Sequence, residues 1–350
     1  MAVDWIGNYL IEWQVNKIDP ASWTIGASVG GVKSFKFNTN GMDDVPLLQS
    51  GSITMDSETG DIENGWYQIV GKMIGQNGDV SLVPLFSMLM ESDTTNFDYG
   101  IGSGTLNGKS VLYPVNKNHM QVGEFLPKGS DGAEWCRRMI GRFTPAPVSI
   151  EAESNFTLNR HFVFDSNTSY LKAVWSVLDA AGWVIRIDGS GNIKLGPKPS
   201  TPTTRFEREA LGLFTPGIDR TLETSDVPNA YYAYYNGEKG SAENRDPDSI
   251  VSIPRRGYIN DVVDTDPKLI NGETIDHYCT RMLRENSVLM RTYTYSRSAF
   301  EPIYPFDMVY INVPGVFNGD ARILTQAYSF ENKRLTIQEM VGEEVRLWQA

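Results

Sequence analysis

Pairs of acidic side chains are the residues in this sequence whose types and spacing first suggest chemistry. The candidate pairs are Glu151 with Glu153, Asp246 with Asp248, and Asp264 with Asp266. Two carboxyl groups on either side of a sugar bond are what glycoside hydrolysis requires. Each pair lies in a polar, loop-like stretch, and a chain with 43 Asp and Glu residues always contains close pairs. We interpret these pairs as solvated surface and predict no catalytic residue.

Metal-binding patterns are weaker still. Asp264, Asp266 and Asn271 lack the fixed ligand spacing of an EF-hand loop. The sequence has three widely separated histidines, none of them in a spacing that places two imidazoles on one helix face: His119, His161 and His277. Cys136 and Cys279 have no CxxC or zinc-type spacing. We predict no metal site, and we expect both cysteines to be buried helix residues.

A glycine-rich stretch, residues 102–110, is the nearest approach to a phosphate-binding loop. A P-loop has four residues between its first glycine and the Gly-Lys pair, which places Ser103 where that first glycine belongs. The required helix is also missing, because residues 111–114 are typical of a short strand stopped by Pro114. We expect a glycine-rich loop leading into a strand and no nucleotide cofactor. A serine nucleophile in a GxSxG elbow is absent too.

The charge balance argues against a nucleic-acid-binding protein. The 350 residues carry 31 Lys and Arg against 43 Asp and Glu, a net charge of −12. Nucleic-acid binding needs a basic face to neutralise phosphates, and no cluster of cations is present. A hydrophobic content of 41% is that of a folded protein. The N-terminus lacks a secretory signal pattern, and the longest apolar stretches fall far short of a membrane span, so we expect neither export nor a spanning segment.

The strands and helices that must position the candidate side chains are predicted to form three blocks along the chain. In the first, polar and apolar residues alternate from Tyr9 to Val15, and four further candidate strands follow at residues 33–37, 50–55, 65–72 and 79–83. Turn signals separate them, among them Gly30-Gly31 and residues 38–41. Short strands at this spacing are typical of an antiparallel barrel or sandwich.

The middle block is helical. Asp131 is a candidate N-cap with Glu134 three residues later, and a second helix is expected after Asn167 or Thr168 and before Gly182. A hairpin follows, with strands at residues 183–187 and 193–195 and a turn at 188–192. The proline-rich segment 197–202 is typical of a linker.

The last block returns to strands, interrupted by one helix. We expect strands at residues 230–235, 250–253, 292–296, 308–313, 322–325, 327–330 and 334–339, with a hairpin turn at 331–333 joining the last pair. The helix is expected to begin after Asn271 and to carry its apolar face as far as Met290. Tyrosines on both faces of strand 230–235 predict neighbours on both sides and favour a sheet packed between domains or subunits.

The order of several motifs resembles the baseplate hub and tail-tip proteins of long-tailed bacteriophages. The matching segments are Ala181-Gly182-Trp183, the turn from Asp188 to Gly191 with Pro197 after it, Asp226-Val227-Pro228-Asn229, Asp248-Ser249-Ile250 through Arg255-Arg256-Gly257, and Pro305-Phe306-Asp307-Met308-Val309. The match covers residues 130–340 well and the earlier part more loosely. The weight comes from the order of the motifs, since no single one is specific.

The resemblance implies a mainly β (α+β) fold in which two antiparallel β-barrel-like tube domains flank a mixed α/β region. The corresponding domains here are residues 1–105, 106–225 and 226–350. It also implies a non-enzymatic hub of the virion, assembled in the host cytoplasm as a homotrimeric ring with a DNA-ejection channel. The implied partners are a distal tail or tail tube protein, fibre or tip proteins, and a tape measure protein in the channel.

The acidity agrees with such a conduit, because an acidic lumen repels DNA and lets it pass without binding. Two other functions stay open from the sequence alone. One is a cell-wall glycan hydrolase that uses a carboxylate pair. The other is a carbohydrate-binding module that uses exposed aromatic side chains.

Overall fold

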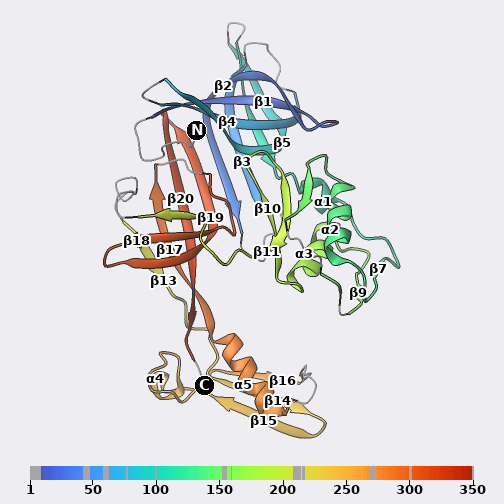
Figure 1. Ribbon diagram of the computed structural model, residues 1–350, viewed down its shortest axis with the longest axis vertical. Helices are drawn as coiled ribbons and strands as arrows, with labels where there is room; N and C mark the ends of the chain where they lie inside the picture. Colours follow the sequence, from blue (N-terminus) through green and yellow to red (C-terminus); the bar gives the residue numbers. More distant parts are fainter. Residues whose placement is uncertain are drawn as a thin grey trace. The chain divides into compact units, whose positions relative to one another are not determined.

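The computed structural model divides the chain into two compact units (Figure 1). The first comprises Met1–Gly217 with Tyr295–Met340, and the second comprises Ile218–Thr294 with Val341–Ala350. The structure describes residues 9–41, 48–57, 63–75, 78–98, 101–151, 156–158, 160–207, 214, 217–265, 267, 273–298 and 302–348. Strands predominate in both units, which confirms the mainly β, α+β fold class.

Six strands at the start of the chain form a closed hydrogen-bonded ring in the order β1-β4-β5-β6-β3-β2, with β2 pairing back to β1. They are β1 (Tyr9–Asp19), β2 (Thr24–Asn40), β3 (Gln49–Ser57), β4 (Gly65–Gly75), β5 (Val80–Asp98) and β6 (Ile101–Lys109). All of these pairings are antiparallel. The alternation expected in β1 is present, because Trp13 and Val15 are buried. The ring leaves no free edge there.

The long strand β2 also joins the ring to a second set of strands. Its C-terminal half pairs with β19, in register from Phe35 with Phe330 to Asn40 with Thr325. The second set comprises β12 (Thr204–Phe206), β17 (Val288–Arg297), β18 (Met308–Val313), β19 (Phe317–Glu331) and β20 (Arg334–Arg346). Because β2 pairs with β1 and β3 in the ring and with β19 in the second set, it continues through Gly30-Gly31 and on to Asn40, so the turns predicted at 30–31 and 38–41 are wrong.

The ring and the second set share one core. Its aromatic members pack closely: the ring centroids of Phe37 and Phe86 lie 4.7 Å apart, and those of Phe86 and Tyr328 lie 5.0 Å apart in an edge-on arrangement. Ile53, Leu106 and Ile337 are fully buried in the same cluster. Side chains that fill a small barrel in this way make a packed core and leave no pore.

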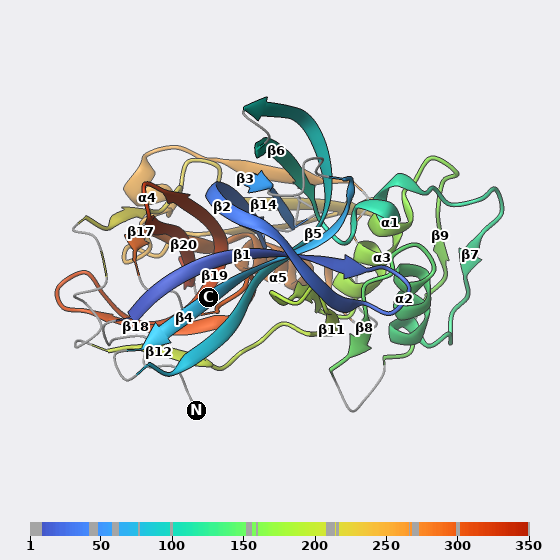
Figure 2. The ribbon, with the colours of Figure 1, turned by 90° about the horizontal axis from the view of Figure 1, so that it is seen from above.

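The middle of the chain forms a helical region to one side of the ring (Figures 1 and 2). It comprises α1 (Tyr113–Lys117), β7 (Phe125–Leu126), α2 (Gly132–Gly141), β8 (Val148–Ile150), β9 (Phe162–Val163), α3 (Tyr170–Asp179), β10 (Trp183–Ile187) and β11 (Ile193–Pro197). Asp131 caps α2, as predicted, by accepting a hydrogen bond from the Glu134 amide at 2.9 Å. The cap of α3 is Ser169, not Asn167 or Thr168, because the Ser169 hydroxyl is the one that accepts from the Lys172 amide.

The second unit contains β13 (Asp219–Thr221), β14 (Ala230–Tyr235), β15 (Glu238–Glu243), α4 (Ile253–Arg256), β16 (Asp261–Asp264) and α5 (Ile275–Asn286). The sheet order is β15-β14-β16, and α5 packs on it through Tyr278, Cys279 and Leu283. A strand at 250–253 is wrong, because the chain turns there and enters α4, whose first turn accommodates Pro254. The cap of α5 is Thr274; the expected cap, Asn271, lies outside the described residues.

The apolar face of α5 is shorter than predicted. The helix ends at Asn286, and Met290 belongs to β17. Both cysteines are buried helix residues, as expected: Cys136 in α2 and Cys279 in α5. The turn predicted at residues 331–333 is also present, because Asn332 and Lys333 adopt left-handed φ values of 52° and 62° between β19 and β20.

Candidate functional site

The turn between β10 and β11, residues 188–192, has a conformation set by its own side chains. One carboxylate oxygen of Asp188 accepts hydrogen bonds from the amides of Ser190 and Asn192, each at 3.0 Å, and the other accepts from the Asn192 side chain at 3.0 Å. Gly191 takes a left-handed φ of 79°, which a glycine adopts without strain. The sequence Asp-Gly-Ser-Gly-Asn therefore folds locally into a rigid turn.

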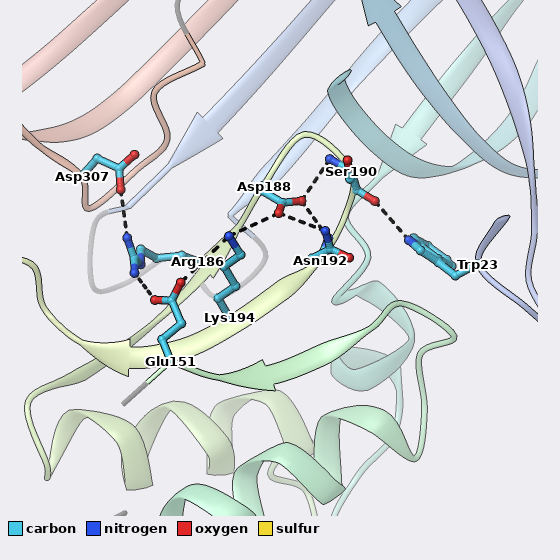
Figure 3. A network of polar contacts seen from close by, with 8 residues as sticks. All are labelled: Trp23, Glu151, Arg186, Asp188, Ser190, Asn192, Lys194 and Asp307. Atoms are coloured by element: carbon cyan, nitrogen blue, oxygen red, sulfur yellow. Dashed lines mark hydrogen bonds and ion pairs between the residues drawn. The ribbon is translucent and has the colours of Figure 1, made fainter. Parts of the chain in front are cut away.

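This turn packs against the six-stranded ring. The Gly189 carbonyl accepts a hydrogen bond from the Ser87 hydroxyl at 3.0 Å. The Ser190 carbonyl accepts one from the Trp23 indole at 3.0 Å, which Figure 3 shows. A Cβ atom on Gly189 would overlap the carbonyl of Pro84 in β5. The close approach therefore requires glycine at this position.

A charged network continues from the turn along the hairpin. Arg186 and Lys194 are cross-strand partners, and like charges placed opposite each other repel. Glu151, which follows β8, lies between them, with an ion pair to Arg186 and a 4.0 Å approach to Lys194 (Figure 3). Lys194 also lies 3.4 Å from Asp188. The two cations are thus balanced by two carboxylates.

The same network reaches the segment before β18. A guanidinium nitrogen of Arg186 donates to Asp307 at 3.1 Å, although 121 residues separate the two in sequence. Asp307 also accepts from the Tyr304 amide at 3.0 Å. Burial raises the pKa of Asp307, and the Tyr304 amide and Arg186 act against that rise. Burial also raises the pKa of Tyr304 to about 12, with the hydrogen bond to the Gly189 backbone opposing it.

We call this set the junction: Trp23, Ser87, Glu151, Arg186, residues 188–192, Lys194 and Asp307. It brings together the six-stranded ring, the helical region and the second set of strands, all within the first unit. Apart from Arg186 Nε, which is buried without a hydrogen-bond partner among the described residues, the polar groups described above contact one another or backbone, so their geometry suits holding three elements in place. It offers no activated nucleophile.

In each candidate pair, a carboxylate that the structure describes is engaged in structural contacts. Glu151 is an ion-pair partner in the junction, and Glu153 lies outside the described residues. Asp246 accepts from the Asp248 amide at 2.9 Å, which makes this pair part of a local turn.

In the third pair, Asp264 accepts hydrogen bonds from the hydroxyls of Tyr278 at 2.5 Å and Tyr231 at 3.2 Å. Its partner Asp266 lies outside the described residues. Burial, together with this hydrogen bonding, raises the pKa of Tyr231. Asp264 therefore fixes α5 to β14.

The glycine-rich stretch 102–110 is strand and not loop. Residues 101–109 form β6, which pairs with β3 and β5 on its two sides. Gly108 pairs with Gly51, and a Cβ atom on Gly51 would overlap the ring of Phe37. Glycines at these positions leave room for aromatic side chains of the core, which explains why the stretch is rich in glycine without a phosphate-binding site.

The three histidines lie apart on separate elements. His119 forms a β-bridge with Ser169, His161 accepts from the Lys128 amide at 3.1 Å, and His277 lies in the first turn of α5. Within the part of the chain that the structure describes, no group of three or more His, Cys, Asp or Glu side chains is arranged to hold a metal ion.

Strand β14 lies between β15 and β16 in its sheet, but these are hydrogen-bonded neighbours, whereas the prediction from its tyrosines concerned the two faces of the strand. One face packs on α5 through Tyr231, whereas Tyr234 and Tyr235 are each 46% exposed. The described residues therefore do not enclose this sheet on both faces, and its packing between domains or subunits stays a prediction.

Sequence reasoning missed the junction as a site, although it located the turn and the Pro305–Val309 motif separately. The available signal was the alternation Ile185-Arg186-Ile187, which puts one cation on the solvent face of an apolar strand. Nothing in the sequence indicated that Asp307 would face it.

Comparison with solved structures finds a similar fold in other proteins. A tail protein of Neisseria meningitidis superposes with a TM-score of 0.64 over 96% of this chain and 97% of that chain, at 12% identity. The chain has the fold of a phage tail protein. A 43 kDa tail protein of prophage MuSo2 from Shewanella oneidensis gives a TM-score of 0.62 over 97% and 98% of the two chains, at 8% identity. The fold expected from the resemblance to hub proteins is therefore confirmed.

A Francisella PdpA–VgrG complex also contains this fold, with a TM-score of 0.60 over 96% of this chain and 58% of that chain, at 8% identity. No model of a protein family matches the sequence, and no curated protein matches it. Among the described residues, no helix has the length and hydrophobicity needed to cross a membrane.

Proposed function

We propose that this chain is a structural hub of a phage tail tip or baseplate. It assembles as a homotrimeric ring, joins the tail tube to the host-facing apparatus and lines the channel for DNA ejection. The observation that carries the proposal is the likeness to two tail proteins over nearly the whole of both chains. In this proposal the tube domains are residues 1–105 and the region 226–350, which supplies β17 to β20.

The proposed partners follow from that position. A distal tail or tail tube protein lies on one side of the ring and fibre or tip proteins lie on the other, while a tape measure protein occupies the channel before ejection. DNA passes without specific binding. The site of action is the virion, after assembly in the host cytoplasm.

Two physical features support a channel between chains. The six-stranded ring is filled by Phe37, Phe86 and Leu106, so a passage for DNA requires several copies around an axis. The net charge of −12 disfavours binding of phosphates to the wall of such a passage.

A non-enzymatic role is supported by the use of the candidate carboxylates. Glu151, Asp246 and Asp264 are each engaged in structural contacts. A cell-wall hydrolase would require a pair of carboxyl groups beside a substrate, and lysis of cell walls abolished by one carboxylate substitution would establish it.

The deciding experiment is electron microscopy of the purified protein without imposed symmetry, combined with a light-scattering mass. We expect a threefold ring with an axial opening and a mass near three times 39.1 kDa. Raising the salt concentration should preserve the ring, since screening weakens repulsion between acidic chains. A particle of one chain, both alone and with a tail tube protein added, would overturn the trimer.

A further inference from the structure

Two strands share one edge of β2 in succession and form a fork where they part. β1 pairs with the first half of β2, β19 pairs with the same edge from Phe35 onward, opposite Phe330, and β3 occupies the other edge. At the base of the fork, the Trp13 ring centroid lies 5.0 Å from that of Phe35, edge-on, and 5.9 Å from that of Phe330. Residues 9–13 of β1 therefore diverge from β2 and pair with β4 alone among the described strands.

A groove of about 360 Å³ occupies the mouth of this fork. Leu10 and Ile11 of β1 line one side, and Phe330 and Leu335 of the β19–β20 hairpin line the other. Leu10 is 60% exposed, and the other three are half-buried against the core of the ring. The volume lies in the range of about 300–1,000 Å³ that is usual for binding pockets. The groove thus offers an apolar surface that a ligand can reach.

The β1 side of the groove also has unused backbone hydrogen-bonding groups. In an antiparallel pair, alternate residues of a strand direct their N–H and C=O groups away from the partner strand. Within residues 9–12 such groups point away from β4, and no other strand that the structure describes pairs with them. An edge of this kind takes an additional strand from another chain through main-chain hydrogen bonds. The backbone therefore favours an extended segment as the ligand.

Two cations stand at the rim of the groove. Lys333 and Arg334 line it, are exposed, and have no ion-pair partner in the part of the chain that the structure describes. The nearest acid in sequence, Glu331, is exposed in the same hairpin and is not among the described lining residues. Even with Glu331 counted, the rim is positive in a chain whose net charge is −12. Charge complementarity therefore favours a segment that carries carboxylates.

The turn that presents these cations has an unusual residue at its second position. Asn332 and Lys333 both adopt left-handed φ values, 52° and 62°, which a two-residue hairpin turn of this type requires. The second position of such a turn is usually glycine, which adopts this conformation without strain. The fold therefore has no need of a lysine at residue 333, and its charge can be removed without disturbing the turn.

We propose that the fork groove binds an extended acidic segment of a partner protein, which adds as a strand to the free edge of β1. The backbone of the segment pairs with residues 9–12, its apolar side chains enter the groove, and its carboxylates meet Lys333 and Arg334. The proposal does not rest on the proposed trimer, because every group of the site belongs to the first unit of one chain.

The test titrates the full chain with the acetylated and amidated peptide EVTVTVE, whose valines alternate and whose ends are acidic. Calorimetry measures the affinity, and hydrogen exchange with mass spectrometry follows the amides of residues 9–12. We expect a dissociation constant on the order of 0.1 mM. We also expect slower exchange in β1, because an added strand protects its amides. The peptides KVTVTVK and ESTSTSE should each bind at least about tenfold more weakly, because each lacks one half of the recognised chemistry.

Variants locate the binding. Lys333→Gly is expected to weaken binding of EVTVTVE about fivefold, with a melting temperature that is unchanged or raised, because glycine suits the turn. Leu10→Ser should weaken binding through the apolar side of the groove, and the exposure of Leu10 keeps the cost in stability small. Lys128→Gln, at an exposed lysine of the helical region, is the matched control and should leave binding unchanged.

Four results would overturn the proposal. The first is no binding of EVTVTVE at millimolar concentration, and the second is equal binding of KVTVTVK, since the cations would then play no part. The third is binding without slower exchange in residues 9–12, since the edge of β1 would then not be used. The fourth is a light-scattering mass that falls in Lys333→Gly, which would assign the groove to a second copy of this chain. The mass of the unsubstituted chain in the same buffer reports separately on the proposed ring.

Discussion

Arg297 in β17 and Glu339 in β20 form a two-pronged ion pair in which neither side chain is exposed to solvent. The two hydrogen bonds measure 2.7 and 2.9 Å. Gln326 donates to the same carboxylate at 2.7 Å, so both glutamate oxygens are satisfied. This pair ties β17 to β20 inside the first unit.

Removing one member of the pair should be severe. Glu339→Gln leaves a buried guanidinium without its counter-charge, and we expect a loss of about 3–5 kcal/mol in the free energy of unfolding. The double variant Arg297→Met with Glu339→Leu removes both charges and should lose much less. Chemical denaturation measures both, and a double variant as unstable as the single one would contradict this account.

The pair of Arg297 and Glu339 should also make the stability of the protein fall at acid pH. Burial opposes the charge of Glu339, but Arg297 and Gln326 more than offset it, so the pKa of this carboxyl is lowered below 4.5. The unfolded chain then binds a proton at higher pH than the folded chain, and the stabilisation is complete above about pH 4.5 and lost as the pH falls through the folded pKa. Melting temperatures between pH 7 and pH 3 should fall less steeply in the double variant than in the wild type.

The junction predicts a strict requirement at Gly189. An alanine there would drive its Cβ into the carbonyl of Pro84, and we expect Gly189→Ala to cost about 1–3 kcal/mol and to loosen the hairpin from the ring. Gly141→Ala is the matched control, because a Cβ at Gly141 meets nothing within 4 Å. Thermal unfolding and limited proteolysis compare the two, and equal stability would show that the ring yields at this contact.

Substitution of Asp307, in the charged part of the junction, should destabilise the protein less than the loss of one member of the buried pair Arg297–Glu339. Asp307→Ala leaves Arg186 with Glu151 alone, and the loss of a charge-assisted hydrogen bond should cost about 1.5–3 kcal/mol. Asp320→Ala, in the same set of strands, is a control acid outside the junction. If both substitutions had the same effect on the denaturation midpoint, the contact between Asp307 and Arg186 would carry no stability.

We expect the two cysteine thiols to be alkylated slowly in the native protein. Burial raises the pKa of the thiols of Cys136 and Cys279, and the thiolate is the reactive form. Alkylation by iodoacetamide at pH 8 should therefore be slow in the native protein and rapid in denaturant. Mass spectrometry after timed quenching gives both rates, and fast native labelling of either residue would show that its element opens readily.

The sequence by itself determined the local elements. Alternation in β1, the Asp131 cap of α2, the stop at Gly182 and the Asp188–Asn192 turn all depend on neighbours within a few residues, so their pattern is visible in one dimension. Some of its mistakes were local, such as the cap of α3 and the strand at 250–253, and others fell where distant partners decide. Strand β2 passes through Gly30-Gly31 because it has β1, β3 and β19 to pair with, and the stretch 102–110 is strand because β3 and β5 flank it.

Only the tertiary structure decided the sites. Arg186 meets Asp307, Arg297 meets Glu339, and Leu10 and Leu335 line one groove because strand pairing and core packing bring together residues that the chain separates. A charge on a strand has many possible counter-charges in a chain with 43 acids, and burial in the folded core selects one. The sequence therefore names the groups, and the packing determines which of them act together.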